Sequence, residues 1–344
     1  MSRELLNTLF IMKEGANAHL NGDTVEVTAE GRRLLQVPLL HLGSVVLFGA
    51  TSMTHQLMMR CAADGRAVTL LDYSGRFRAR VVGPTSGNVL LRKAQYDTHA
   101  SSDRSRDIAR SIVGAKIRNA RQNIARGARD TEDADTEASL REATASLDSL
   151  LRSLPEADTV DAIRGIEGQA AAVSFGVFGR LILRDKAEFA FTVRTRRPPR
   201  DRVNALLSFL YTLLQGDCTA ALEGVGLDPQ FGFLHALRPG RPALALDLME
   251  EFRPCIADRL ALTLINRRQI NPAQFEEHEK GAVLLNEEGR KIVLTEYQKR
   301  KQEEVRHPFL KETTPLGLVP HLQARLLARH LRGDLPSYSP FTVR

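Results

Sequence analysis

The stretch Asp97-Thr98-His99-Ala100-Ser101-Ser102 separates two parts of the chain that differ in the spacing of their apolar residues. Its residues are small or polar, which predicts a linker ending in a helix cap. Before it, apolar residues alternate as they do in strands; after it, they recur every three or four positions, as in helices. The sequence therefore predicts an α+β protein, with a β domain in residues 1–96 and an α-helical domain in residues 97–344.

Strands are expected upstream. Residues 24–28 and 77–81 alternate, whereas residues 44–48 and 68–71 are short, continuous apolar runs. A short helix over residues 52–63 fits between these runs, with Ser52 as its cap.

Helices are expected downstream. Residues 103–154 predict a helix that breaks near Asp130, and a further helix starts after Asp158 or Thr159. An apolar helix over residues 203–215 is expected to end at Gly216, and a later helix, starting at Ala243, to be interrupted by Pro254. Residues 281–294 predict a hairpin, residues 194–200 a basic loop and residues 297–332 a helical tail.

Composition limits the classes of protein. Only three cysteines occur in 344 residues, which argues against a disulfide framework or a cysteine-rich zinc site and favours the cytoplasm. No apolar run is long enough for a transmembrane helix, and no signal pattern is seen. The net charge of +7 permits a nucleic-acid partner, and residues 104–129 concentrate basic side chains. The alternative is a solvated helix face.

Glu167 lies within an apolar helix stripe that includes Ile163 and Ala170. A carboxylate there must be paired, protonated or bound to metal. The alternatives are a buried ion pair or a partly exposed position at the helix edge. The flanking Gly165 and Gly168 would allow another backbone to approach closely.

His235 follows a turn at Asp228-Pro229 and lies beside aromatic residues. Taken alone, such a histidine is more often a hydrogen-bonded core residue than a ligand.

The string Asp247-Leu248-Met249-Glu250-Glu251-Phe252-Arg253-Pro254 places acidic residues on one helix face. Asp247 shares a face with both Glu250 and Glu251, so periodicity alone does not choose between them. Such charges need a cation or a base such as Arg253. A surface acidic patch is the alternative. One imidazole with two or three carboxylates would suit Mg²⁺ or Mn²⁺.

These motifs resemble the CRISPR-associated endonucleases that act as integrases in spacer acquisition, the first family in the Cas numbering. The resemblance rests on residues 164–168, 232–235 and 238–254, and on the order Glu, His, Asp-x-x-Glu. It extends over essentially the whole chain, and the subtype resembles that of type I-C systems.

The resemblance implies an N-terminal β-sandwich-like domain, an all-helical catalytic domain and a homodimer joined through the β domains. It implies the metal ligands Glu167, His235 and Glu250, with Asp247 acidic beside them. The implied partners are DNA, as a captured fragment and the CRISPR repeat, and the small second adaptation protein.

The implied reaction joins the 3′-hydroxyl ends of captured DNA to the repeat. We expect DNA contacts from Lys116, Arg118, Arg121, Arg241 and Arg253, and from the basic loop over residues 194–200. A DNase that only hydrolyses DNA and a non-catalytic DNA-binding scaffold remain as alternatives.

Overall fold

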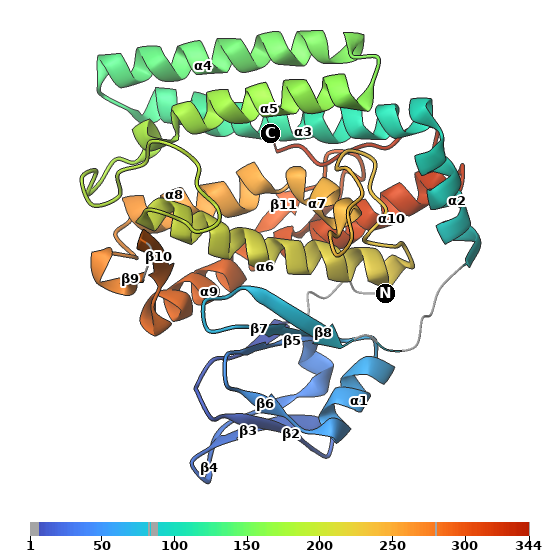
Figure 1. The fold of residues 1–344 in the computed structure, drawn as a ribbon, viewed down its shortest axis with the longest axis vertical. Helices are drawn as coiled ribbons and strands as arrows, with labels where there is room; N and C mark the ends of the chain where they lie inside the picture. The colour runs from blue at the N-terminus through green and yellow to red at the C-terminus, as the bar shows by residue number, and fades with distance from the viewer. Residues whose placement is uncertain (1–6, 82, 84–88, 279–280, 344) are drawn as a thin grey trace.

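The computed structural model describes residues 7–81, 83, 89–278 and 281–343. Strands fill the first part of the chain and helices dominate the rest, as Figure 1 shows. The fold is mixed α/β with an N-terminal β-rich region, which confirms the predicted class. The helices and 3₁₀ or π turns that position the site all follow residue 88.

Two four-stranded sheets make up the β-rich region. Their strands are β1 (Asn7–Ile11), β2 (Asn17–Asn21), β3 (Thr24–Ala29), β4 (Arg32–Pro38), β5 (Leu42–Phe48), β6 (Ser52–Met53), β7 (Ala67–Leu71) and β8 (Phe77–Val81). One sheet has the order β1-β5-β7-β8 and the other β4-β3-β2-β6. The pairs β1–β5, β5–β7 and β2–β6 are parallel, and the other neighbours are antiparallel.

One apolar core lies between the two sheets. Val25 and Val27 point into it from β3, and Val45 and Leu47 from β5. The alternation predicted for residues 24–28 is therefore confirmed, and the region is sandwich-like. Helix α1 (His55–Ala63) contributes Leu57 to the same core, but its cap is Thr54 rather than the predicted Ser52, which lies in β6.

The rest of the chain is mostly helical. Its helices are α2 (Val89–Ala100), α3 (Ser102–Asp130), α4 (Ala134–Ser153), α5 (Val160–Gly176), α6 (Arg202–Val225), α7 (Ala243–Glu250), α8 (Arg259–Asn266), α9 (Glu287–Gln302) and α10 (Val319–Leu331). Short strand pairs, β9 (Phe275–His278) with β10 (Ala282–Leu285) and β11 (Glu304–Arg306) with β12 (Thr313–Pro315), lie among the later helices.

The predicted linker is wrong at residues 97–100, which form the last turn of α2. Tertiary hydrogen bonds hold the end of α2 in place: Gln95 donates to the carbonyls of Asp228 and Phe231, and His99 Nδ1 lies 2.7 Å from the Gly232 carbonyl. Only Ser101 separates α2 from α3. The polar stretch therefore docks against the loop before α7.

Two of the other predicted boundaries are confirmed and two are wrong. The break near Asp130 and the start of α5 after Thr159 are confirmed, and the Thr159 side chain accepts a hydrogen bond from Ala162 N. Gly216, however, lies inside α6, which ends at Gly226 with φ +87°. The hairpin predicted over residues 281–294 is misplaced: it is β9–β10, and Asn286 caps α9.

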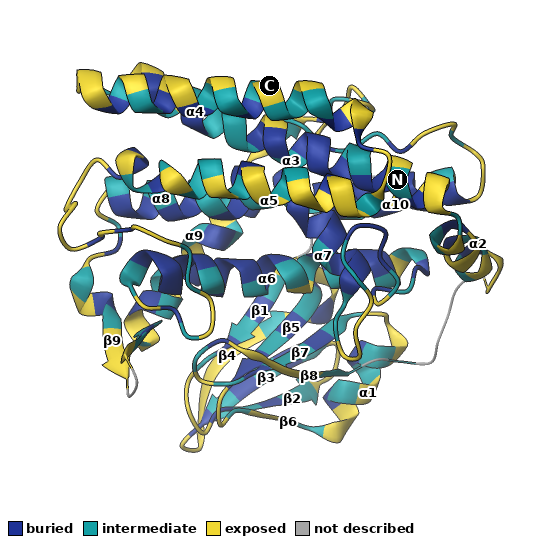
Figure 2. Cartoon of the chain, turned by 45° about the horizontal axis from the view of Figure 1, so that its top comes forward, coloured by how far each residue is buried: buried dark blue, intermediate teal, exposed yellow. Residues whose placement is uncertain are grey.

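Helix α6 runs through the middle of the molecule (Figure 2), with its apolar side chains buried. An 18-residue window of this helix is apolar enough to cross a membrane, but 67% of the window is buried inside the protein. The β-rich region packs on it: the rings of Phe48 and Phe209 are 6.3 Å apart, and Arg80 pairs with Glu223. Helix α6 is therefore the core helix that joins the two regions.

Helices α3, α4 and α5 lie side by side, at the top of the view in Figure 1. Below them, α7 ends at Glu250 and a π-helical turn follows over residues 253–258. Pro254 has no N–H to continue the α-helical ladder, so the predicted interruption is confirmed. This break lies directly after the residues expected to carry the chemistry.

Candidate metal centre

The loop carrying His235 is held on α7 by one buried carboxylate. Asp247 is fully buried and accepts backbone hydrogen bonds from Phe233 (2.5 Å), Leu234 (2.9 Å) and His235 (2.9 Å). Gly232 is needed beside it, since a Cβ there would lie 2.6 Å from Asp247 Oδ2 and 2.7 Å from the Ala243 backbone. The loop therefore fits closely against the start of α7.

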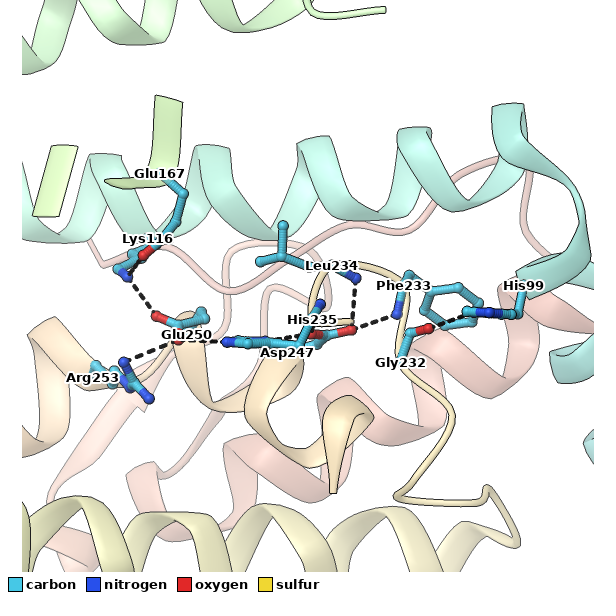
Figure 3. A network of polar contacts seen from close by, with 10 residues as sticks. All are labelled: His99, Lys116, Glu167, Gly232, Phe233, Leu234, His235, Asp247, Glu250 and Arg253. Carbon is cyan, nitrogen blue, oxygen red and sulfur yellow. Dashed lines mark hydrogen bonds and ion pairs between the residues drawn. The ribbon is translucent and has the colours of Figure 1, made fainter. Parts of the chain in front are cut away.

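The same carboxylate orients the imidazole of His235. Asp247 Oδ1 lies 2.7 Å from His235 Nδ1, which leaves Nε2 on the other side of the ring, 3.8 Å from Glu250 Oε1. A carboxylate on one ring nitrogen fixes the tautomer that leaves the other nitrogen able to bind metal. His235 is thus an oriented imidazole, as Figure 3 shows.

Glu250 lies at the centre of the cluster. Its Oε1 is 3.0 Å from Arg253 Nη1, and its Oε2 is 2.7 Å from Lys116 Nζ. Burial alone would raise the pKa of Glu250, but the charges of Arg253 and Lys116 lower it to about 2. The carboxyl is therefore ionised at neutral pH.

Glu167 reaches the cluster from the opposite side. It comes from α5, and its Oε1 pairs with the same Lys116 ammonium that contacts Glu250. Its side chain is 26% exposed, so the site opens toward solvent here. The predicted close approach at Gly165 and Gly168 is wrong, because a Cβ at either would meet only open space.

The choice between the neighbouring carboxylates of α7 is settled by their directions. Glu251 points away from the cluster and accepts hydrogen bonds from Gln323 Nε2 (3.0 Å), Phe341 N (2.7 Å) and the Tyr338 hydroxyl. Burial raises the pKa of Glu251 to about 7. Glu250, not Glu251, shares the cluster with Glu167 and His235.

The three predicted ligands thus meet at Glu250: its Oε2 shares the Lys116 ammonium with Glu167, and its Oε1 lies 3.8 Å from His235 Nε2. With that ammonium in place, no group of three or more His, Cys, Asp or Glu side chains is spaced to hold a metal within the described part of the chain. The side chains nevertheless fit a divalent ion: two carboxylates and one imidazole are suitable donors, and the buried Oε2 of Glu250 has no hydrogen bond of good geometry.

The basic residues fall into two groups. Lys116 and Arg253 are inside the cluster, and Arg253 also stacks on Tyr211, with its guanidinium 4.8 Å from the ring centre. Arg118 and Arg121 line a surface hollow of about 480 Å³ with Arg129 and the C-terminal Val343. Arg121 also pairs with Asp148 of α4 at 2.6 Å.

The other two predicted DNA contacts differ from each other. Arg241 lies in the loop just before α7 and is partly exposed. In the basic loop, Arg194 is turned inward and donates to the Asn204 side chain (2.7 Å) and Ser208 (3.1 Å). That residue therefore holds the loop in place, whereas Arg196, Arg197 and Arg200 make up its remaining charge.

Comparison with known proteins decides the family. The model of the family described as CRISPR associated protein Cas1 matches residues 9–299. The chain belongs to the Cas1 family. It is 53% identical over 340 residues to a Moorella thermoacetica CRISPR-associated endonuclease Cas1, covering 99% of each chain, and 51% identical to one from Rhodospirillum rubrum, covering 98% of this chain and 99% of that one.

Solved structures share the Cas1 fold. A CAS1 protein from Thermotoga maritima superposes with a TM-score of 0.81 at 23% identity, covering 95% of this chain and 97% of that one. A casposase bound to its integration product gives 0.83 at 22% identity, covering 97% and 93%. At these sequence identities, the solved structures support the fold of this Cas1 chain but not its catalytic activity.

Sequence reasoning missed the place of Lys116 in this Cas1 chain. It was expected on the basic face of a DNA-binding helix, but its side chain is only 12% exposed and lies between two acidic groups. The sequence does contain a local signal that Lys116 is buried, because its neighbours on α3 are the apolar residues Val113, Ala115 and Ile117, which are all buried.

Proposed function

We propose that this chain is a metal-dependent DNA integrase and endonuclease of CRISPR adaptation. The observation that carries the proposal is that Glu167 of α5 and Glu250 of α7 share one ammonium, while His235 Nε2, from the loop before α7, lies 3.8 Å from Glu250 Oε1. Relatives that match over nearly the full chain bear the name CRISPR-associated endonuclease Cas1.

In this proposal Mg²⁺ or Mn²⁺ would be held by Glu167, His235 Nε2 and Glu250. When bound, such an ion polarises a phosphate and activates an attacking oxygen. Asp247 keeps the His235 ring in the orientation that exposes Nε2, and the low pKa of Glu250 keeps that ligand charged. Arg253 partly neutralises the negative charge of the cluster through its contact with Glu250 Oε1.

The attacking group distinguishes integration from hydrolysis. In strand transfer, the 3′-hydroxyl of a captured DNA forms the new bond to phosphorus and a strand of the repeat leaves. In hydrolysis, water takes the place of the 3′-hydroxyl. The endonuclease names of the relatives support the hydrolytic alternative, whereas the casposase, a neighbour in fold, is bound to an integration product.

The assembly is part of the proposal. We expect a homodimer formed by the β domain of residues 1–96, leaving residues 97–344 as the catalytic domain. Exposed Leu34 and Leu35 on the edge strand β4 and the nearby Leu40 support this surface. DNA and the small second adaptation protein are the expected partners, since the structural neighbours include a Cas6-RT-Cas1--Cas2 complex and a TtCas1-DNA complex.

Two finer assignments belong with this proposal. We expect the subtype to be I-C, as the family resemblance of the chain implies. We expect the protein in the cytoplasm, which suits its free and buried Cys61, Cys218 and Cys255.

The test is the product formed from a labelled DNA fragment and a supercoiled repeat plasmid with Mn²⁺. The integrase proposal predicts joined strands, and hydrolysis alone predicts only cleaved ends. Glu167→Gln and His235→Ala should each abolish joining while DNA binding, measured by gel shift, persists. Undiminished joining in both variants would refute the assigned centre.

A further inference from the structure

We infer that Lys116 is a built-in competitor of the divalent ion: its ammonium takes the position between Glu167 and Glu250, and the ion binds by displacing it. This inference rests on the proposed function in one respect, namely that these carboxylates bind a divalent ion. It adds a residue that limits how tightly the ion is held.

The contacts place the ammonium where the carboxylate oxygens converge. Lys116 Nζ pairs with Oε1 of Glu167 and lies 2.7 Å from Oε2 of Glu250. The side chain is 12% exposed and crosses from α3 to both α5 and α7 (Figure 3). An ion held by both glutamates would lie between them, where the Lys116 ammonium already contacts one oxygen of each, so the ammonium and the ion compete for this position.

The second cation of the cluster differs from the first. Arg253 contacts the other oxygen of Glu250, Oε1, at 3.0 Å and is fixed by stacking on Tyr211. Lys116 has a flexible four-carbon stem that can move its ammonium without moving the helix. Removal of Lys116 therefore frees the carboxylate pair, whereas Arg253 remains as a permanent neighbour.

The ammonium explains how the two glutamates can lie close together. Without a cation, the ionised Glu250 and Glu167 would repel each other in a largely buried site. The ammonium compensates their charges, at the expense of affinity for a divalent ion. An opposite charge beside a carboxylate changes its affinity for a competing proton by roughly 10- to 1000-fold, and a divalent ion meets the same competition.

The main experiment measures Mn²⁺ binding to the full-length protein by calorimetry, in wild type and in Lys116→Met. Methionine keeps the length of the side chain and removes its charge. We expect the dissociation constant for Mn²⁺ to fall at least about tenfold. Lys301→Met is the matched control, because Lys301 is also buried and paired, with Asp217 at 3.0 Å, but lies outside the cluster; its affinity should equal that of wild type.

A second measurement uses the wild-type chain and does not depend on how well the variant folds. Reductive methylation of lysines, read by mass spectrometry, reports whether an ammonium is protected. We expect Lys116 to be protected without metal and to become reactive when Mn²⁺ is added, while Lys301 does not change.

The outcomes separate the two claims. Equal or weaker Mn²⁺ binding by Lys116→Met, or a Lys116 that stays protected with Mn²⁺ bound, overturns the inference and leaves the metal centre standing. Absence of Mn²⁺ binding in wild type and variant alike overturns the metal centre itself, and the inference with it.

Discussion

Replacing Asp247 by asparagine substitutes one carboxylate oxygen with an amino group and removes the charge. In the native chain, Oδ2 accepts the N–H groups of Phe233 and Leu234, and Oδ1 accepts that of His235 and contacts His235 Nδ1. The asparagine carbonyl can serve only one of these pairs. The orientation with the carbonyl oxygen in the place of Oδ2 costs less free energy. The amide NH₂ then takes the place of Oδ1, where it faces one backbone N–H and a ring nitrogen that can become an acceptor.

The magnitude follows from the bonds that change. The N–H of His235 loses its acceptor, which costs about 1–3 kcal/mol, and the two remaining backbone bonds lose their charge assistance. Together the free energy of unfolding should fall by about 2–5 kcal/mol. The proton of His235 moves to Nε2, which blocks that atom as a ligand, so Mn²⁺ affinity should fall by about 10- to 100-fold.

Urea unfolding followed by far-ultraviolet circular dichroism measures the first effect, since the chain has no tryptophan to report it. Calorimetric titration with Mn²⁺ measures the second. Asp97→Asn is the control, because the Asp97 side chain is exposed and pairs with Lys93 at the surface; it should change stability by less than about 0.5 kcal/mol. An Asp247→Asn protein that unfolds and binds Mn²⁺ like wild type would refute the role given to this carboxylate.

Three further predictions concern other parts of the molecule. Because burial raises the pKa of Glu251 to about 7, its contribution to stability is present below the unfolded-state value of about 4.5 and is lost as pH rises through 7; Glu251→Gln should therefore reduce the loss of unfolding free energy between pH 5 and 8 by about 3 kcal/mol, and an unchanged pH profile would contradict this. Leu35→Asp combined with Leu40→Asp should convert a dimer into a monomer in light scattering, whereas a persisting dimer would exclude this surface. Arg118→Ala combined with Arg121→Ala should reduce the slope of log DNA affinity against log salt by about one to two units, and an equal slope would remove the α3 hollow from the DNA path.

Elements with strong local signals were predictable. The Thr159 cap and the break near Asp130 depend on side chains acting within a few residues, so periodicity and capping rules located the break between α3 and α4 and the start of α5. The alternation of apolar and polar residues in β3 likewise predicted a strand that buries one face of its sheet. These features need no knowledge of distant contacts.

Elements fixed by distant contacts were not predictable. Residues 97–100 are polar enough for a linker, yet bonds from α2 to the Gly232 loop hold them helical. Gly216 carries a local stop signal, but burial of the surrounding α6 face outweighs the cost of a glycine in a helix. Local propensity is a weak guide where packing decides.

The candidate site divides in the same way. The residues Glu167, His235, Asp247 and Glu250 were found from the sequence motifs, and the structure brings their side chains together. What the motifs do not contain is the direction of each side chain. Asp247 accepts the hydrogen bonds of the His235 loop, and Lys116 lies between the two glutamates. Both arrangements depend on how α3, α5 and α7 pack together.

The most direct test of the metal centre is anomalous diffraction from a crystal soaked in Mn²⁺. We predict one strong peak in bonding contact with Glu167, His235 Nε2 and Glu250, with the Lys116 ammonium moved away from it. A well-diffracting soaked crystal with no peak among these three side chains, or with Mn²⁺ bound only elsewhere, would contradict the account.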